Sequence, residues 1–81
     1  MSEGWFTKPV SVAVGITGHA RYVMSARQAP ALLAEHWPAK GTPKHRDALV
    51  ACRDAQHGSK SADMARARFV EAALQARVLI D

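Results

Sequence analysis

The sequence predicts a small α+β domain in which an N-terminal β-hairpin precedes three α-helices, in the order ββααα. Two observations support this prediction. The first part of the chain alternates apolar and smaller polar residues, as a half-buried strand does, whereas the rest repeats its apolar residues at helical spacing. Gly and Pro residues also punctuate the chain where these patterns change. With 81 residues, the chain is expected to form a single domain over residues 1–81.

The β-hairpin is predicted over residues 5–24, after a disordered start at residues 1–4. Its first strand begins with a proline, where a missing amide N–H costs least, and continues with alternating valines: Pro9, Val10, Val12 and Val14. A turn follows at residues 15–18, and the return strand is predicted over residues 20–24. Because an isolated hairpin is unstable in water, we expect the third helix to cover it. Residues 78–81 are predicted to be extended and able to add a short third strand.

The first helix is predicted within residues 25–38. Ser25 followed by Gln28 is a capping-box pattern. Apolar residues then recur at helical spacing: Ala26, Ala29, Leu33 and Trp37. Pro30 falls near the first turn, where proline is tolerated best, and leaves open a start several residues later. Pro38 is expected to end the helix.

Two further helices are predicted over residues 42–58 and 61–77. Thr42 and Ser61 are good N-cap residues, and Gly58 stands where a left-handed C-cap is needed. The second helix separates small apolar residues from a charged side. The third helix is apolar over more than half of its circumference, and its main stripe is accompanied by a second apolar strip: Ala67, Val70 and Leu74.

The spacing of the apolar and punctuating residues resembles that of a family of small bacterial proteins. The residues that carry the resemblance are Pro9, Val10, Val12, Ala29, Leu32, Leu33, Trp37, Pro38, Ala48, Cys52, Ala55, Gly58, Ser61, Ala62, Ala65, Arg66, Phe69, Ala72, Ala73 and Ala76. Over about residues 5–80 this pattern is similar to domain-of-unknown-function family nine hundred and eighty-two, which is typical of rhizobia and related alphaproteobacteria. The resemblance implies no activity, cofactor or site residue.

The composition limits the cellular compartments and the kinds of partner that we expect for this protein. Cys52 is the one cysteine, so an intrachain disulfide is impossible, and the residues after Met1 do not resemble a secretory signal. No apolar stretch approaches the length of a membrane span. We therefore expect a cytoplasmic protein that does not enter membranes. Its formal net charge of +4 favours anionic partners without naming one.

The sequence offers little for catalysis or cofactor binding. His45 and Cys52 share a face of the second helix, but seven residues, about 10.5 Å of helix, separate them, which is too far for one zinc ion. We therefore expect no metal and no cofactor. His36 is interpreted as a packed, hydrogen-bonded residue, because no carboxylate or nucleophile stands where it would orient the ring. The GxxG at residues 15–18 joins two predicted strands, so it is interpreted as a turn. We predict that the protein is not an enzyme.

Two hypotheses for function remain. The leading one is a small non-catalytic protein-interaction module whose partner is another protein or a second copy of itself, as a homodimer. Its expected contacts are the second strip of the third helix and one apolar residue stranded on the charged side of the second helix: Val50, Ala67, Val70 and Leu74. The same strip is equally expected if the third helix is simply the central helix of the domain.

The alternative hypothesis is a basic accessory protein that binds nucleic acid through phosphates. Its expected contacts lie on one exposed stripe of the second helix and just beyond it: Arg46, Arg53 and Lys60. Two aspartates form a parallel acidic stripe on the same helix, and few aromatic residues are available for base stacking. We therefore rank nucleic-acid binding second.

Overall fold

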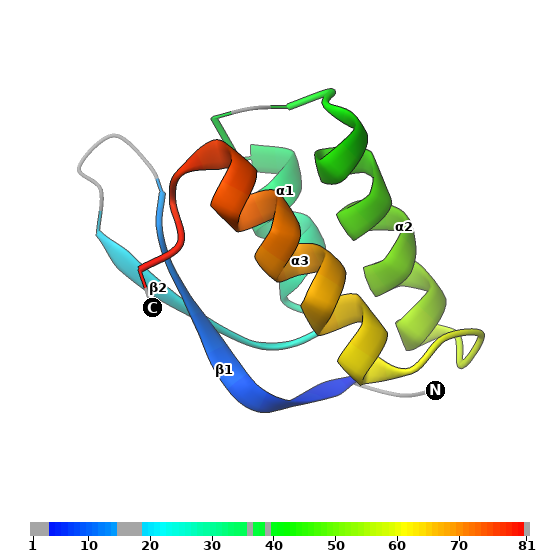
Figure 1. Cartoon of the computed structure of the whole chain (residues 1–81). Coiled ribbons are helices and arrows are strands. Elements are labelled where there is room, and N and C mark those ends of the chain that lie inside the picture. Colours follow the sequence, from blue (N-terminus) through cyan, green and yellow to red (C-terminus); the bar gives the residue numbers. More distant parts are fainter. Residues whose placement is uncertain (1–3, 15–18, 36, 39, 81) are drawn as a thin grey trace.

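The computed structural model describes residues 4–14, 19–35, 37–38 and 40–80. Its elements confirm the predicted α+β class: β1 (Trp5–Ala13), β2 (Ala20–Ser25), α1 (Ala29–Glu35), α2 (Pro43–Gln56) and α3 (Ala62–Ala76). Figure 1 shows the three helices on one side of the hairpin. The predicted turn at residues 15–18, the expected packing of His36 and most of the predicted disordered start lie outside the described residues.

The hairpin is a regular antiparallel pair over most of its length. Its register runs from Val10 opposite Val23 to Ala13 opposite Ala20, and the pairing is irregular between Trp5 and Val10. One face is buried under the helices, as the alternating valines predict, and it carries Val10, Val12, Val14 and Val23. Apolar burial on this face holds the hairpin to the rest of the chain.

The C-terminal segment lies along the free edge of β1 without forming a strand. The Ala13 N–H donates to the Val78 carbonyl (2.8 Å), and the Ile80 N–H donates to the Ser11 carbonyl (2.9 Å). These bonds produce one isolated antiparallel bridge, between Val12 and Leu79. The predicted extended segment is thus present, but within the described residues it makes a bridge and no third strand.

The first helix is shorter than the pattern predicts. It begins at Ala29 and not near residue 25, because Pro30 lacks the amide N–H that an earlier start would require within the helix. The side chain of Gln28 accepts a hydrogen bond from the Met24 N–H (2.9 Å), one residue before the predicted capping-box partner. The Ala26 N–H instead donates to the carbonyl of Gly4 (2.8 Å), so Gly4 is held against the fold and is not part of a disordered start.

Helices α2 and α3 begin at the predicted N-caps. The Thr42 hydroxyl accepts from the His45 N–H (3.2 Å), and the Ser61 hydroxyl accepts from the Met64 N–H (3.1 Å). Each bond satisfies one of the amides that the first turn of a helix leaves without a partner. The helix starts are therefore set by local side-chain chemistry.

The core lies between the hairpin and the helices, and Phe69 of α3 is its largest fully buried side chain. The rings of Phe69 and Trp37 have centroids 5.4 Å apart and are tilted by 47°. On the flank of α3, the Arg66 Nε donates to the Lys8 carbonyl of β1 (2.9 Å). As predicted, α3 covers the hairpin.

Candidate functional site

Helices α2 and α3 form an antiparallel pair whose outer surface is the candidate site. Their connection is short, so residues early in α2 lie beside residues late in α3. The Lys44 Nζ lies 3.3 Å from the Glu71 Oε1, and the Arg68 Nη1 lies 3.3 Å from the same oxygen. This three-residue cluster, Lys44–Glu71–Arg68, links the two helices at the surface.

The electrostatics of this cluster favour the charged form of its carboxylate. The hydrogen bond and charge of Lys44, followed by those of Arg68, lower the pKa of Glu71 below its ordinary value. All three side chains are solvent-accessible, so water and salt screen the attraction. The cluster therefore aligns the helices without adding much to stability.

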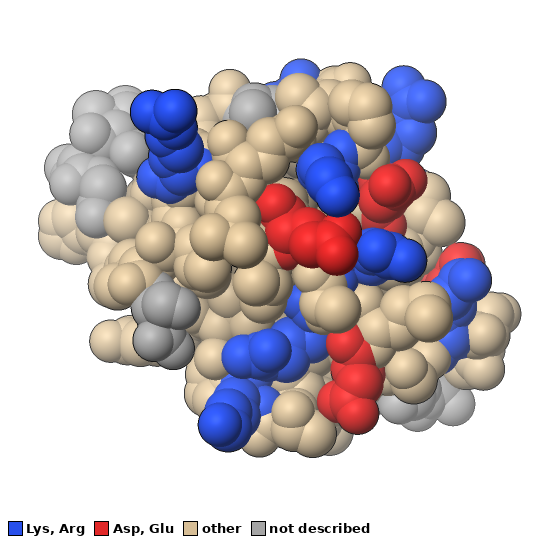
Figure 2. Space-filling model, in the orientation of Figure 1, with Lys and Arg blue, Asp and Glu red and all other residues tan. Residues whose placement is uncertain are grey.

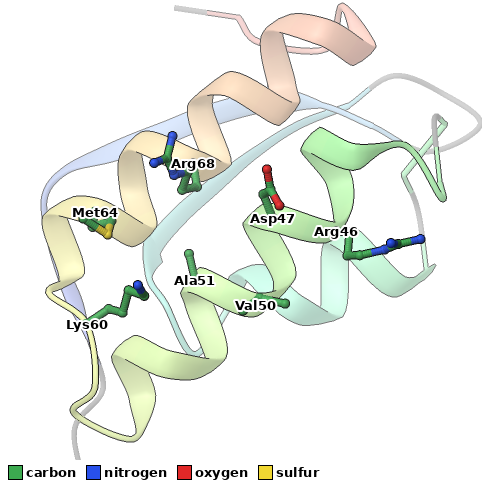
Figure 3. A pocket seen from close by; sticks show the side chains of 7 residues that line it. All are labelled: Arg46, Asp47, Val50, Ala51, Lys60, Met64 and Arg68. Carbon is green, nitrogen blue, oxygen red and sulfur yellow. The ribbon is translucent and has the colours of Figure 1, made fainter.

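A hollow of about 370 Å³ lies next to this cluster. It is lined from α2 by Arg46, Asp47, Val50 and Ala51, from the connecting segment by Lys60, and from α3 by Met64 and Arg68. In Figure 3 the amine of Lys60 extends toward the middle of the hollow, whereas Arg46 lies at the other end and points outward. We call this feature the α2–α3 hollow.

The α2–α3 hollow combines an apolar floor with a basic rim. Val50 and Met64 expose 50% and 42% of their surface, and Ala51 is nearly buried between them. Three cationic side chains and one carboxylate, Asp47, surround this floor. Arg68 is paired with Glu71, whereas Arg46, Lys60 and Asp47 form no ion pair with another described residue.

The residues of the predicted apolar interface lie on two separate surfaces, one at the α2–α3 hollow and one on α3. Val50 lines the α2–α3 hollow. Leu74 is 60% exposed on α3, and Ala67 is exposed two turns earlier on the same face. Val70 is half-buried and packs against the domain's own core. Ala67 and Leu74 therefore remain accessible for a partner, whereas Val70 is largely used within the domain.

The predicted anion contacts are also divided. Arg46 and Lys60 line the same hollow, but Arg53, although exposed on α2, does not line it. Figure 2 shows acidic side chains interspersed among basic ones on the face formed by α2 and α3. This face is a mixed surface and not a continuous basic patch.

His45 and Cys52, which we considered as metal ligands, are both buried. The His45 Nε2 lies 2.7 Å from the Leu33 carbonyl, and its Nδ1 accepts from the Gly41 N–H (3.4 Å). A carbonyl accepts and an amide N–H donates, so each ring nitrogen has a backbone partner of matching kind when the Nε2 carries the proton. Burial raises the pKa of the Cys52 thiol to about 12. Within the described ranges, no three His, Cys, Asp or Glu side chains gather as a metal site.

Four residues of the hollow are absent from the predicted contacts: Asp47, Ala51, Met64 and Arg68. Met64 and Arg68 are both exposed on α3. The available signal is the spacing of Met64 and Arg68, since residues four apart share one helix face. The sequence alone does not show that α2 lies beside these α3 residues, and this neighbour makes them one wall of a hollow.

A second exposed apolar group lies on the face of the sheet that the helices leave open. Tyr22 and Met24 are two residues apart in β2 and are 66% and 45% exposed. Ile80 is 52% exposed beside the edge of β1, where its N–H donates to the Ser11 carbonyl.

None of the described helices is long and apolar enough to cross a membrane.

Comparison with known protein families adds the decisive observation on relationship. The model of a family described as "Protein of unknown function (DUF982)" matches residues 8–80, which is nearly the whole chain. The chain belongs to the DUF982 family. This DUF982 match confirms the resemblance seen in the sequence pattern and assigns no activity. Comparisons with curated proteins and with solved structures found no significant match.

Proposed function

We propose that this DUF982 protein is a small non-catalytic protein-interaction module that forms a homodimer. The observation that carries the proposal is Leu74, a bulky apolar side chain held 60% exposed on a regular helix. Many of the domain's own core positions are filled by alanine, so apolar bulk at the surface stands out. An exposed Leu beside an exposed Ala on a rigid helix presents a contact of the kind that helix pairing uses.

The position of α3 makes this contact surface preformed. Phe69 and Ala73 anchor the opposite side of the helix in the core, so Leu74 is held without any rearrangement. A partner that covers Leu74 loses little conformational freedom in the process, because the backbone is already ordered. Two antiparallel copies of α3 would each place Leu74 near Ala67 of the other copy.

The test is the solution mass of the protein and of a Leu74→Glu variant, measured by sedimentation equilibrium. We expect a two-chain mass for the wild type, and for the variant a dimer dissociation constant raised at least about tenfold, because the interface would have to bury a charge. Gln75→Glu is the matched control, since it adds the same charge at an exposed neighbouring position and should leave the dimer intact. A one-chain wild-type mass at hundreds of micromolar contradicts the homodimer.

The second candidate function is nucleic-acid binding, favoured by the presence of Arg46 and Lys60 at one hollow and of Arg53 on the same helix. Affinity for mixed-sequence DNA or RNA should then fall steeply as salt rises, because phosphate contacts release counterions. Arg53→Glu should weaken it. An affinity that does not change with salt argues against this function.

We also propose a cytoplasmic location and a bacterial, alphaproteobacterial source. Support for the source comes from the DUF982 match together with the rhizobial character of the pattern it resembles. Support for the compartment comes from a buried, free thiol, which suits a reducing environment. Fractionation of cells that express the tagged protein tests the location.

A further inference from the structure

We propose that the α2–α3 hollow docks an acidic amphipathic helix of a partner protein. This inference rests on the proposed interaction-module function and specifies the chemistry of a partner other than a second copy. It uses a surface separate from Leu74, which does not line the hollow.

The charge of the hollow selects a negative partner. Arg46, Lys60 and Arg68 line it against the single carboxylate of Asp47. Of these cations, Arg68 is already paired with Glu71. Arg46 and Lys60 thus offer charge to a partner's carboxylates, and the chain as a whole, with a net charge of +4, attracts acidic molecules from a distance.

The floor of the hollow calls for apolar side chains in addition to charge. Val50, Ala51 and Met64 supply apolar surface at its base, and Met adapts its shape to different partners. A volume of about 370 Å³ is enough for one or two large aliphatic side chains. An apolar side chain that enters it removes the exposed surface of Val50 and Met64 from water.

The shape of the hollow favours a helix. Its walls are two antiparallel helices, and a third helix packs naturally along such a pair. Arg46 lies in the first turn of α2, and Lys60 lies beyond the last residue of this helix, Gln56, so the two cations are at opposite ends of the hollow (Figure 3). A docked helix therefore needs carboxylates on both sides of its apolar residues.

Phosphates fit the same hollow less well. The lining residues include no aromatic ring on which a base could stack. An apolar floor contributes nothing to binding a sugar–phosphate backbone. A protein helix with both apolar and acidic residues contacts both the apolar floor and the cations, whereas nucleic acid uses the cations alone.

The test is fluorescence anisotropy with a labelled helical peptide of about 18 residues, which carries two Leu residues one turn apart and Glu residues at each end of that pair. Matched peptides replace Glu by Lys or Leu by Ser, and a single-stranded DNA of similar length is the fourth probe. We expect the Glu/Leu peptide to bind at least about tenfold more tightly than either matched peptide.

Variants of the protein locate the binding. Lys60→Glu should weaken the Glu/Leu peptide about tenfold, and Met64→Ser several-fold. Arg53→Glu makes the same charge reversal on α2 outside the hollow and should change affinity less than about twofold. Leu74→Glu should leave peptide binding unchanged even where it dissociates the dimer, so failure of the homodimer and failure of this inference are separable.

Three results overturn the inference. One is a Glu/Leu peptide that produces no anisotropy change up to millimolar protein. Another is an equal effect of Lys60→Glu and Arg53→Glu, which indicates general charge attraction and no docking site. The third is DNA binding that exceeds peptide binding and ignores Met64→Ser, which assigns the basic rim to nucleic acid.

Discussion

At the scale of single residues, the buried polar groups serve the fold. His45 is 7% exposed and joins the end of α1 to the loop that precedes α2, through the Leu33 carbonyl and the Gly41 N–H. Hydrogen bonds to both ring nitrogens lower the cost of burying these polar atoms. Both hydrogen bonds of the ring go to backbone groups, so they serve the packing of the fold.

Cys52 provides the prediction at this scale. Burial raises its pKa from 9.0 to about 12, so at pH 8 the folded protein should hold about a thousandfold less thiolate than the unfolded chain. Labelling by a disulfide reagent should be slower by at least that factor in buffer than in concentrated urea. Because the unfolded thiol ionises first, stability should fall as pH rises from about 9 toward 12. Equal labelling rates in both conditions contradict this placement of Cys52.

At the scale of elements, α2 and α3 end in the same motif with different residues. Gly58 has a φ of 82°, with Ser59 N–H donating to the Asp54 carbonyl (2.8 Å). Arg77 has a φ of 60°, with Val78 N–H donating to the Ala73 carbonyl (3.0 Å). Both are Schellman motifs, in which a left-handed residue turns the chain out of the helix. Glycine does this without steric cost, whereas Arg77 does not.

Replacing Arg77 therefore tests backbone strain at a helix end. Arg77→Gly should raise the free energy of unfolding by about 1 kcal/mol, because glycine tolerates the left-handed conformation. Arg77→Ala removes the same side chain but keeps the strain, so it should leave stability nearly unchanged. Urea unfolding followed by circular dichroism measures both. The interpretation fails if the glycine and alanine variants have equal stability.

The two helix ends also show how far the sequence predicts the elements. Gly58 predicts the C-cap of α2, because glycine is the usual left-handed residue. Arg77 carries no such signal, and the sequence pattern includes it in the third helix. Pro30 indicates a late start of α1, but the sequence gives no sign of the hydrogen bond between Ala26 and Gly4 that accompanies it. Helix caps and turns can be predicted from neighbouring residues in the sequence, whereas contacts between distant segments cannot. The α2–α3 hollow belongs to the second kind, since Met64 and Arg68 lie beside the α2 residues of the hollow only because the two helices pair.

At the scale of the whole molecule, the domain has two layers, with the three helices on one side of the two-stranded sheet. The opposite face of β2 carries Tyr22 and Met24 in the open, so the hairpin is stabilised from one side. The buried side relies heavily on alanine, which allows α2 and α3 to approach closely but contributes little apolar area per residue. Stability is thus concentrated in a few large side chains, chiefly Phe69, Leu33 and Trp37.

Phe69 should therefore carry an unusually large share of the stability. Phe69→Ala is expected to cost about 3–5 kcal/mol, because it removes a fully buried ring and its contact with Trp37. A chain of 81 residues has a total stability of only about 4–12 kcal/mol, so the variant should be partly or fully unfolded at 25 °C. Tyr22→Ala removes an aromatic ring from the open face and should change stability by less than about 0.5 kcal/mol. Urea unfolding of both variants measures the difference, and comparable losses would show that the open face is as important as the core.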